Sequence, residues 1–236
     1  MEDRQIQFYL ADTVIERPYA FEISGQPFYI YPVTLGKSYL LARLTENLNL
    51  DAANLGVNPY IEALRICTDN RADAIRLIVY HTFSKKEELF DYKLVENRCS
   101  YFDENLDCEE IANLLITVMS YDKTEQFVKY LGIDKDEVWK KKVSNLKSEQ
   151  GCSVSFGGKS VYGTLIDFAC ERYGWSYEYV LWGISLVNLK MMMRDSISTQ
   201  YLTKEEQKKL RIPTDRTYIS GDSKENIARF KKYFSD

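Results

Sequence analysis

The chain has 236 residues, of which 45% are hydrophobic and 28% charged, and its formal net charge is −4. This length and apolar content suffice for one large domain or two small ones, each with a buried core. The small negative charge argues against a general nucleic-acid-binding protein, because neutralising phosphates requires clustered surplus cations.

The content of cysteine and histidine limits the chemistry that the chain can support. The five cysteines are widely spaced and form no CxxC pair, which is typical of reduced thiols in the cytosol. The N-terminal residues lack the basic stretch and apolar run of a secretory signal peptide. His81 is the only histidine, so a His-rich zinc site or a His-based triad has little material. We therefore expect no metal and no cofactor.

The first thirty-odd residues alternate apolar and polar side chains, which is typical of β-strands. IQFYL at 6–10 predicts a strand, and YAFEISGQPFYIY predicts a hairpin that turns at SGQP. Phe21 and Ile23 fall on one face of the first hairpin strand, and Phe28 and Ile30 on one face of the second.

From Thr34 onward the spacing of apolar residues becomes helical, and Thr34 itself can cap the first helix, whose apolar stripe extends to Leu48. Gly132 is expected to end a helix and Asp134 to cap the next one. Further helices are expected at about 59–67, 70–82, 107–120, 123–131 and 134–148.

These elements predict an α+β protein that is mainly α, with an N-terminal β-hairpin, then a helical bundle with a C-terminal helical hairpin. We expect a region 1–150, with the hairpin and most helices, and a C-terminal helical module at 151–236. One continuous domain also fits. The charged segment 134–150 predicts a solvated helix, or alternatively a linker between two modules.

Two short motifs, GGKS at 157–160 and GKS at 36–38, are similar to the end of a phosphate-binding loop. A Walker A motif needs a glycine five residues before its second glycine, but Ser153 and Tyr31 occupy these positions. A turn in which Ser160 or Thr34 begins a helix is the better interpretation, and no nucleotide site is expected.

Catalytic residues are equally hard to find. Asp167 and Glu171 share a helix face, but no His, Cys or third carboxylate stands at ligand spacing. They favour a surface charge cluster, and an enzyme would need them to line one deep pocket with Arg172. His81 is interpreted as a hydrogen-bonded or exposed histidine. We therefore expect a protein that is not an enzyme.

The most apolar stretch of the chain, ERYGWSYEYVLWGISLVNLKMMM, lies at 171–193. Gly174 is expected to end one helix and Ser176 to cap the next, with Glu178 in its first turn. A DNA-reading helix is excluded because the second helix presents apolar side chains instead of groups that bind base edges. A membrane span is excluded because the apolar segment 177–193 is too short and is interrupted by polar residues.

A single helix over 177–193 would be apolar nearly all round, with two apolar stripes where a surface helix has one. It is therefore either central in a helical core or divided between its own domain and a partner. Methionine fills irregular contacts, so the run of three favours an adaptable surface. The residues expected to contact a partner are Tyr177, Tyr179, Trp182, Leu186, Met191, Met192 and Met193.

The early FEISGQPFYIYPVTLGK and the late LIDFACERYGWSYEYVLWGISLVNLKMMM together resemble tail assembly chaperones of long-tailed bacteriophages, in particular the Gp15-type group. The likeness lies in an apolar helix, a YG turn and a helix that contains tryptophan. It covers the late segment and, more loosely, the N-terminal one, whereas 50–150 has no counterpart. The matching residues are Phe168, Tyr173, Gly174, Trp182, Leu186 and Leu189.

The resemblance implies a phage or prophage protein without enzymatic activity, present in the cytoplasm of the bacterial host. Its partners would be the tape-measure protein and tail-tube subunits. A tape-measure helix exposes apolar stripes that aggregate unless another apolar surface covers them. A structural virion subunit of the tail or neck is the alternative. Neither a nucleic acid nor a membrane is expected as a partner, and homo-oligomerisation is left open.

Overall fold

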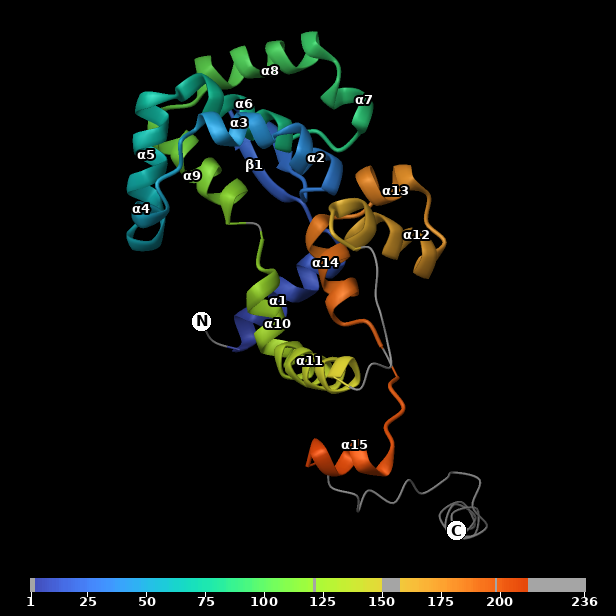
Figure 1. The fold of residues 1–236 in the computed structure, drawn as a ribbon. Helices are drawn as coiled ribbons and strands as arrows, with labels where there is room; N and C mark the ends of the chain where they lie inside the picture. Colours follow the sequence, from blue (N-terminus) through green and yellow to red (C-terminus); the bar gives the residue numbers. More distant parts are fainter. Residues whose placement is uncertain (1–2, 121, 150–157, 198, 212–236) are drawn as a thin grey trace, which may run out of the picture. The chain divides into compact units, whose positions relative to one another are not determined.

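The computed structural model describes residues 3–120, 122–149, 158–197 and 199–211 (Figure 1). Contacts divide the chain into two units, one formed by 1–137 with 155–196 and the other by 138–154 with 197–236. The boundary expected between residues 150 and 151 lies outside the described residues. Mainly helical α+β architecture with an N-terminal hairpin, as predicted, is confirmed.

The first element is a helix, α1 (Asp3–Val14), so the strand predicted at 6–10 is wrong. The alternating segment at 6–10 has no strand to pair with, because the described sheet contains only the two hairpin strands. The helix instead lies against α10 (Thr124–Leu131) and α14 (Leu186–Arg194). Gln7 donates a hydrogen bond to the hydroxyl of Tyr130 at 2.7 Å. Tertiary contacts therefore decide the conformation of this segment.

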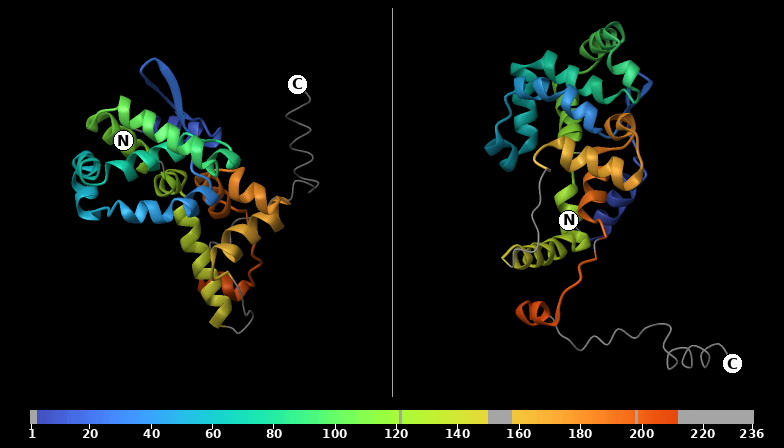
Figure 2. Two further views of the ribbon diagram at one scale, coloured as in Figure 1. Left: turned by 90° about the horizontal axis from the view of Figure 1, so that it is seen from above. Right: turned by 45° about the vertical axis from the view of Figure 1, so that its right-hand side comes forward.

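The predicted hairpin is confirmed. Strands β1 (Tyr19–Ile23) and β2 (Gln26–Ile30) pair antiparallel, as the left panel of Figure 2 shows. The two loop residues, Ser24 and Gly25, have φ values of 49° and 80°. Positive φ at both positions is the signature of a type I′ turn, whose twist matches that of the flanking strands.

Between the hairpin and residue 149 most of the predicted helices are present, together with three that were not predicted, α4 (Ala52–Val57), α7 (Lys86–Leu89) and α8 (Tyr92–Asn105). The predicted stop at Gly132 is confirmed by its left-handed φ of 75°, but Asp134 lies in the first turn of α11 and not before it. The helices from the hairpin to residue 149 are α2 (Leu35–Leu40), α3 (Ala42–Asn47), α4 (Ala52–Val57), α5 (Pro59–Asp69), α6 (Arg71–His81), α7 (Lys86–Leu89), α8 (Tyr92–Asn105), α9 (Cys108–Met119), α10 (Thr124–Leu131) and α11 (Ile133–Glu149).

The main hydrophobic core of the first unit joins the hairpin to α5, α6, α8 and α9. Helix α5 packs on α9, and α6 packs on both α8 and α9. The apolar face of the hairpin contacts α8, where the ring of Phe102 stands edge-on to those of Phe21 and Phe28 at 6.1 and 5.0 Å. The apolar face that the alternating sequence gives to the hairpin thus forms one side of the helical core.

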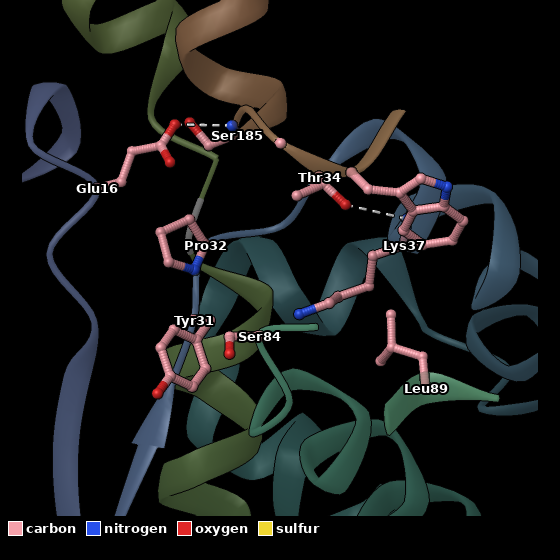
Figure 3. Close-up of a pocket in the computed structure, with 10 residues that line it drawn as sticks. Glu16, Tyr31, Pro32, Thr34, Lys37, Ser84, Leu89 and Ser185 are labelled. Atoms are coloured by element: carbon pink, nitrogen blue, oxygen red, sulfur yellow. Dashed lines mark hydrogen bonds between the residues drawn. The ribbon is translucent and has the colours of Figure 1, made fainter. Parts of the chain in front are cut away.

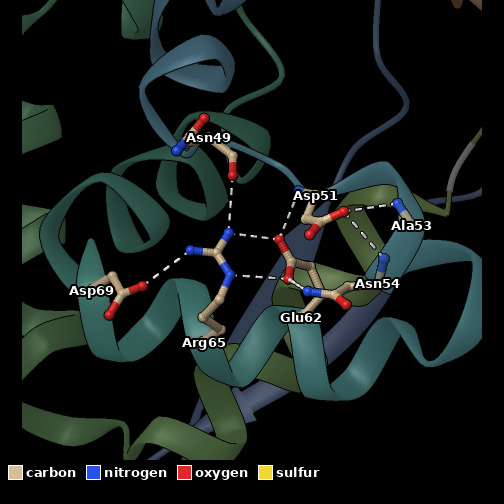
Figure 4. Close-up of polar contacts among 7 residues, drawn as sticks. All are labelled: Asn49, Asp51, Ala53, Asn54, Glu62, Arg65 and Asp69. Atoms are coloured by element: carbon tan, nitrogen blue, oxygen red, sulfur yellow. Dashed lines mark hydrogen bonds and ion pairs between the residues drawn. The ribbon is translucent and has the colours of Figure 1, made fainter.

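A buried carboxylate fixes the start of α5 (Figure 4). The side chain of Glu62 is fully buried and forms an ion pair with Arg65 at 2.6 Å. The carboxylate also accepts hydrogen bonds from the backbone of Asp51 at 2.8 Å and from the amide of Asn54 at 3.2 Å. Arg65 also forms an ion pair with Asp69 at 3.0 Å. These bonds lower the pKa of Glu62 to about 2, with the Arg65 bonds as the largest cause.

The late segment forms the predicted helical hairpin, with Gly174 in a left-handed conformation (φ 67°) and Ser176 accepting a hydrogen bond from the Tyr179 backbone as N-cap. The single helix expected over 177–193 is wrong, because two helices occupy this range. The elements are a π-helical turn (Tyr162–Ile166), α12 (Asp167–Tyr173), α13 (Tyr177–Trp182) and α14 (Leu186–Arg194).

The break between α13 and α14 is held by contacts with the N-terminal part of the chain. The backbone N–H of Ser185 donates to the carboxylate of Glu16 at 2.7 Å, and that of Leu186 donates to the carbonyl of Val33 at 2.7 Å. Glycine at 183 weakens a continuous helix, and the Ser185 hydroxyl caps the second one. The N–H groups of Ser185 and Leu186, which would bond to carbonyls within a continuous helix, therefore bond to the N-terminal part of the chain instead.

In the second unit, α15 (Lys204–Lys209) begins with a capping box between Thr203 and Glu206. The ammonium of Lys147, in the last turn of α11, donates to the carbonyl of Tyr201 at 3.1 Å. No helix in the described ranges combines the length and apolarity needed to cross a membrane.

Candidate functional site

Aromatic rings gather at the start of α13. The ring of Trp175 lies 4.8 Å from that of Tyr173 and 5.1 Å from that of Tyr179. Tyr179 is 44% exposed, and its neighbour Tyr177 is 51% exposed. We call Tyr173, Trp175, Tyr177 and Tyr179 the aromatic surface.

Small residues and caps hold the aromatic surface in place. Gly174 ends α12 in a conformation that L-residues rarely adopt, which lets Tyr173 and Trp175 approach across the turn. A Cβ at Gly183 would collide with the ring of Tyr179, so this ring lies over the helix end only because a glycine is there. The two glycine positions therefore support the aromatic surface, although two of its rings meet solvent.

Trp182 has different surroundings from the aromatic surface. Its ring lies against α2, where a Cβ at Gly36 would stand 2.8 Å from three ring atoms. Phe90 meets the ring edge-on at 6.0 Å, and the ammonium of Lys86 lies 5.8 Å from its centroid. The main role of Trp182 in the structure is to join α13 to α2.

The remaining predicted contact residues are half-buried along α14. Leu186 and Met192 pack against a second core cluster built on Leu35, Val180 and Leu189. Met191 and Met193 are also half-buried, and Met193 borders a separate pocket between α10 and α14.

The seven predicted residues thus lie in three different surroundings, and their role in partner binding stays a prediction. Trp175 was missed by the prediction, although its place directly after the Gly174 turn is a usable signal.

A pocket of about 160 Å³ lies where the chain leaving the hairpin, α2, α7 and the start of α14 meet (Figure 3). The side chain of Lys37 extends into it between Ser84 and Leu89. The ammonium donates a hydrogen bond to the carbonyl of Phe83 at 2.8 Å. Other lining residues are Glu16, Tyr31, Pro32, Thr34, Trp182 and Ser185. No pattern in the sequence predicts this pocket, because GKS at 36–38 indicates only the start of a helix after Thr34.

Lys37 is only 2% exposed, and this burial lowers the pKa of its ammonium to about 8, with Glu88 acting weakly in the opposite direction. Next to it in the core, burial lowers the pKa of His81 to about 4, and the charge of Lys37 lowers it further. The Nδ1 atom of His81 lies 2.7 Å from the carbonyl of Leu77, so the expectation of a hydrogen-bonded histidine is confirmed.

The polar residues considered as catalytic candidates do not converge. Asp167 and Glu171 are exposed on α12, and neither they nor Arg172 line the two pockets described above. Across the residues that the structure describes, no three His, Cys, Asp or Glu side chains come together as metal ligands would.

No protein-family model, curated protein or solved structure matches the chain. The aromatic surface and the Lys37 pocket, built from the chain's own residues, are therefore the basis on which a function can be assigned.

Proposed function

We propose that this protein is a bacteriophage or prophage tail assembly chaperone that acts in the host cytoplasm without enzymatic activity. It would bind the tape-measure protein, and tail-tube subunits, until the tail is assembled. The observation that carries the proposal is the aromatic surface, where Tyr177 and Tyr179 meet solvent beside Trp175 on a supported helix start.

The chemistry of this surface suits a helical apolar partner. Tyrosine and tryptophan offer large contact areas at a small cost in side-chain entropy, and they dominate the binding energy of many interfaces. Their polar atoms tolerate water in the free protein. A surface of this kind can cover an apolar stripe and later release it.

Binding is tested by co-expressing the chain with a tape-measure protein from the same phage or prophage and measuring the affinity of the purified pair. We expect Tyr177→Ser combined with Tyr179→Ser to weaken binding at least tenfold, since truncating one hot-spot residue costs about 2 kcal/mol or more. The matched control is Tyr39→Ser with Tyr92→Ser, because these tyrosines are also exposed but lie on α2 and α8. Trp182 is unsuitable for this test because its loss would disturb α2.

Equal affinity for the double variant and the unaltered protein would show that the aromatic surface is not the binding site. Absence of any complex would count against the chaperone function itself. Mass spectrometry of purified particles separates the alternative, since a structural tail or neck subunit remains in the virion in stoichiometric amounts and a chaperone does not.

A further inference from the structure

Lys37 is a buried cation whose charge has no close counter-ion. Its ammonium has three donors, and the one hydrogen bond found for it goes to the carbonyl of Phe83 at 2.8 Å. Among the described residues, no carboxylate lies within the 4.0 Å of an ion pair to it. Burying a charge is costly unless it is paired, so the ammonium donors that do not reach Phe83 favour an acceptor in the pocket that Lys37 lines.

The neighbouring ionisable groups do not neutralise Lys37 through an ion pair. Arg98, on α8, donates to the hydroxyl of Thr82 at 2.9 Å, so a second cation lies near the end of α6. His81 is neutral at pH 7 because of its lowered pKa. Glu88 acts on Lys37 from α7 without pairing with it.

The carboxylate of Glu16 lies at the opposite side of the pocket (Figure 3). One of its oxygens is already engaged, because it accepts from the Ser185 backbone at 2.7 Å and from the Asn188 amide at 3.1 Å. Glu16 therefore stabilises the start of α14 and forms no ion pair with Lys37.

The size and walls of the pocket restrict what can enter. A volume of about 160 Å³ holds a few heavy atoms and is below the roughly 300–1,000 Å³ of drug-sized sites. Tyr31, Leu89 and Trp182 provide apolar walls, and Ser84 also lines the pocket. An anion with a short apolar stem fits these walls, whereas a nucleotide is too large.

We propose that this pocket binds one carboxylate group on a short aliphatic chain, with the Lys37 ammonium as its counter-ion. Such a group is carried by the aspartate or glutamate side chain of a partner protein, or by a free short-chain carboxylic acid. The site is distinct from the aromatic surface, and its occupancy does not depend on the proposed chaperone function.

The test uses the full chain labelled with ¹⁵N, titrated with sodium propionate at pH 7 and followed through the indole N–H signals. The signal of Trp182 is assigned as the one that remains in both Trp139→Phe and Trp175→Phe, since the chain has three tryptophans. We expect this signal to shift saturably, with a dissociation constant on the order of millimolar for so small a ligand. Propionamide, which has the same shape without the charge, and sodium chloride should leave it unchanged. An equal response to propionamide, or no response to propionate, overturns the proposal.

Lys37→Met keeps the length of the stem and removes the charge, so we expect propionate to bind at least tenfold more weakly. Lys93→Met, on the exposed side of α8, is the matched control. Undiminished binding by the Lys37 variant would refute the role of the ammonium.

A second measurement needs no variant. Raising the pH from 7 to 9 takes Lys37 through its pKa of about 8, so propionate binding should weaken by about tenfold as the positive charge is lost. Binding that stays constant over this range would also refute the proposal.

The source of the carboxylate is identified by a blocked glutamate, N-acetyl-glutamate N-methylamide. Competition with propionate at similar concentration would assign the pocket to an acidic side chain of a protein. Binding of propionate alone would assign it to a free acid.

Discussion

Replacing Glu62 by glutamine should lower the free energy of unfolding by about 3 kcal/mol at pH 7. Both oxygens of the carboxylate face donors, namely Arg65 and Asp51 on one side and Arg65 and Asn54 on the other. Either orientation of a glutamine amide therefore points its own N–H groups at the Arg65 guanidinium. Removing one partner of a buried ion pair typically costs about 3–5 kcal/mol.

The lowered pKa of Glu62, which has the same contacts as its cause, leads to a similar value. Its folded-state pKa is depressed from 4.5 to about 2, which corresponds to ~3.4 kcal/mol at 1.36 kcal/mol per unit. A depressed carboxylate pKa stabilises the folded state above the unfolded pKa, and this stability is lost as the pH falls toward the folded pKa. By pH 3, about 2 kcal/mol of it should have gone.

The assay is urea unfolding of the unaltered protein and Glu62→Gln at pH 7 and pH 3. We expect the difference in unfolding free energy to shrink from about 3 to about 1 kcal/mol. Glu46→Gln, at an exposed glutamate on α3, should change stability by less than about 0.5 kcal/mol. A difference that is the same at both pH values, or below about 1 kcal/mol at pH 7, would contradict the buried ion pair.

Two further predictions concern α2 and α6. Gly36→Ala should destabilise the fold by about 1–3 kcal/mol in urea unfolding, since its Cβ would press on the ring of Trp182, whereas Gly56→Ala, which meets open space, should be neutral or slightly stabilising. The pKa of His81 is about 4 in the fold and ordinarily 6.5, so the unfolded chain binds more protons between these values and stability should fall by up to ~3 kcal/mol as the pH drops from 6.5 to 4. The stability of His81→Gln in thermal unfolding should lack this pH dependence. If the stabilities of the variant and of the unaltered protein changed with pH in parallel, the buried neutral histidine would be refuted.

Local patterns in the sequence predicted the structure correctly where that structure depends on residues close together in the chain. The hairpin follows from its alternation and a turn that suits Ser24 and Gly25. The stop at Gly132 and the cap at Ser176 follow from conformational preferences of single residues. The aromatic surface was partly predicted for the same reason, because Tyr177 and Tyr179 stand in the first turn of a capped helix.

Prediction failed where distant segments meet. Alternation at 6–10 resembles a strand, yet contacts with α10 and α14 make it helical. The apolar run at 177–193 resembles one helix, but hydrogen bonds to Glu16 and Val33 divide it. The Lys37 pocket is assembled from four separate parts of the chain, and no spacing within any one of them could indicate it.

The hydrogen bond from Ser185 to Glu16 joins residues 169 positions apart. During synthesis from the N-terminus, the α13–α14 junction can be fixed only after Leu186 has left the ribosome. Pairing over such a distance is late and slow, because the entropy of closing the loop is lost before the contact compensates for it. The arrangement therefore makes the position of α14 depend on the N-terminal part of the chain, which supplies both acceptors at the junction.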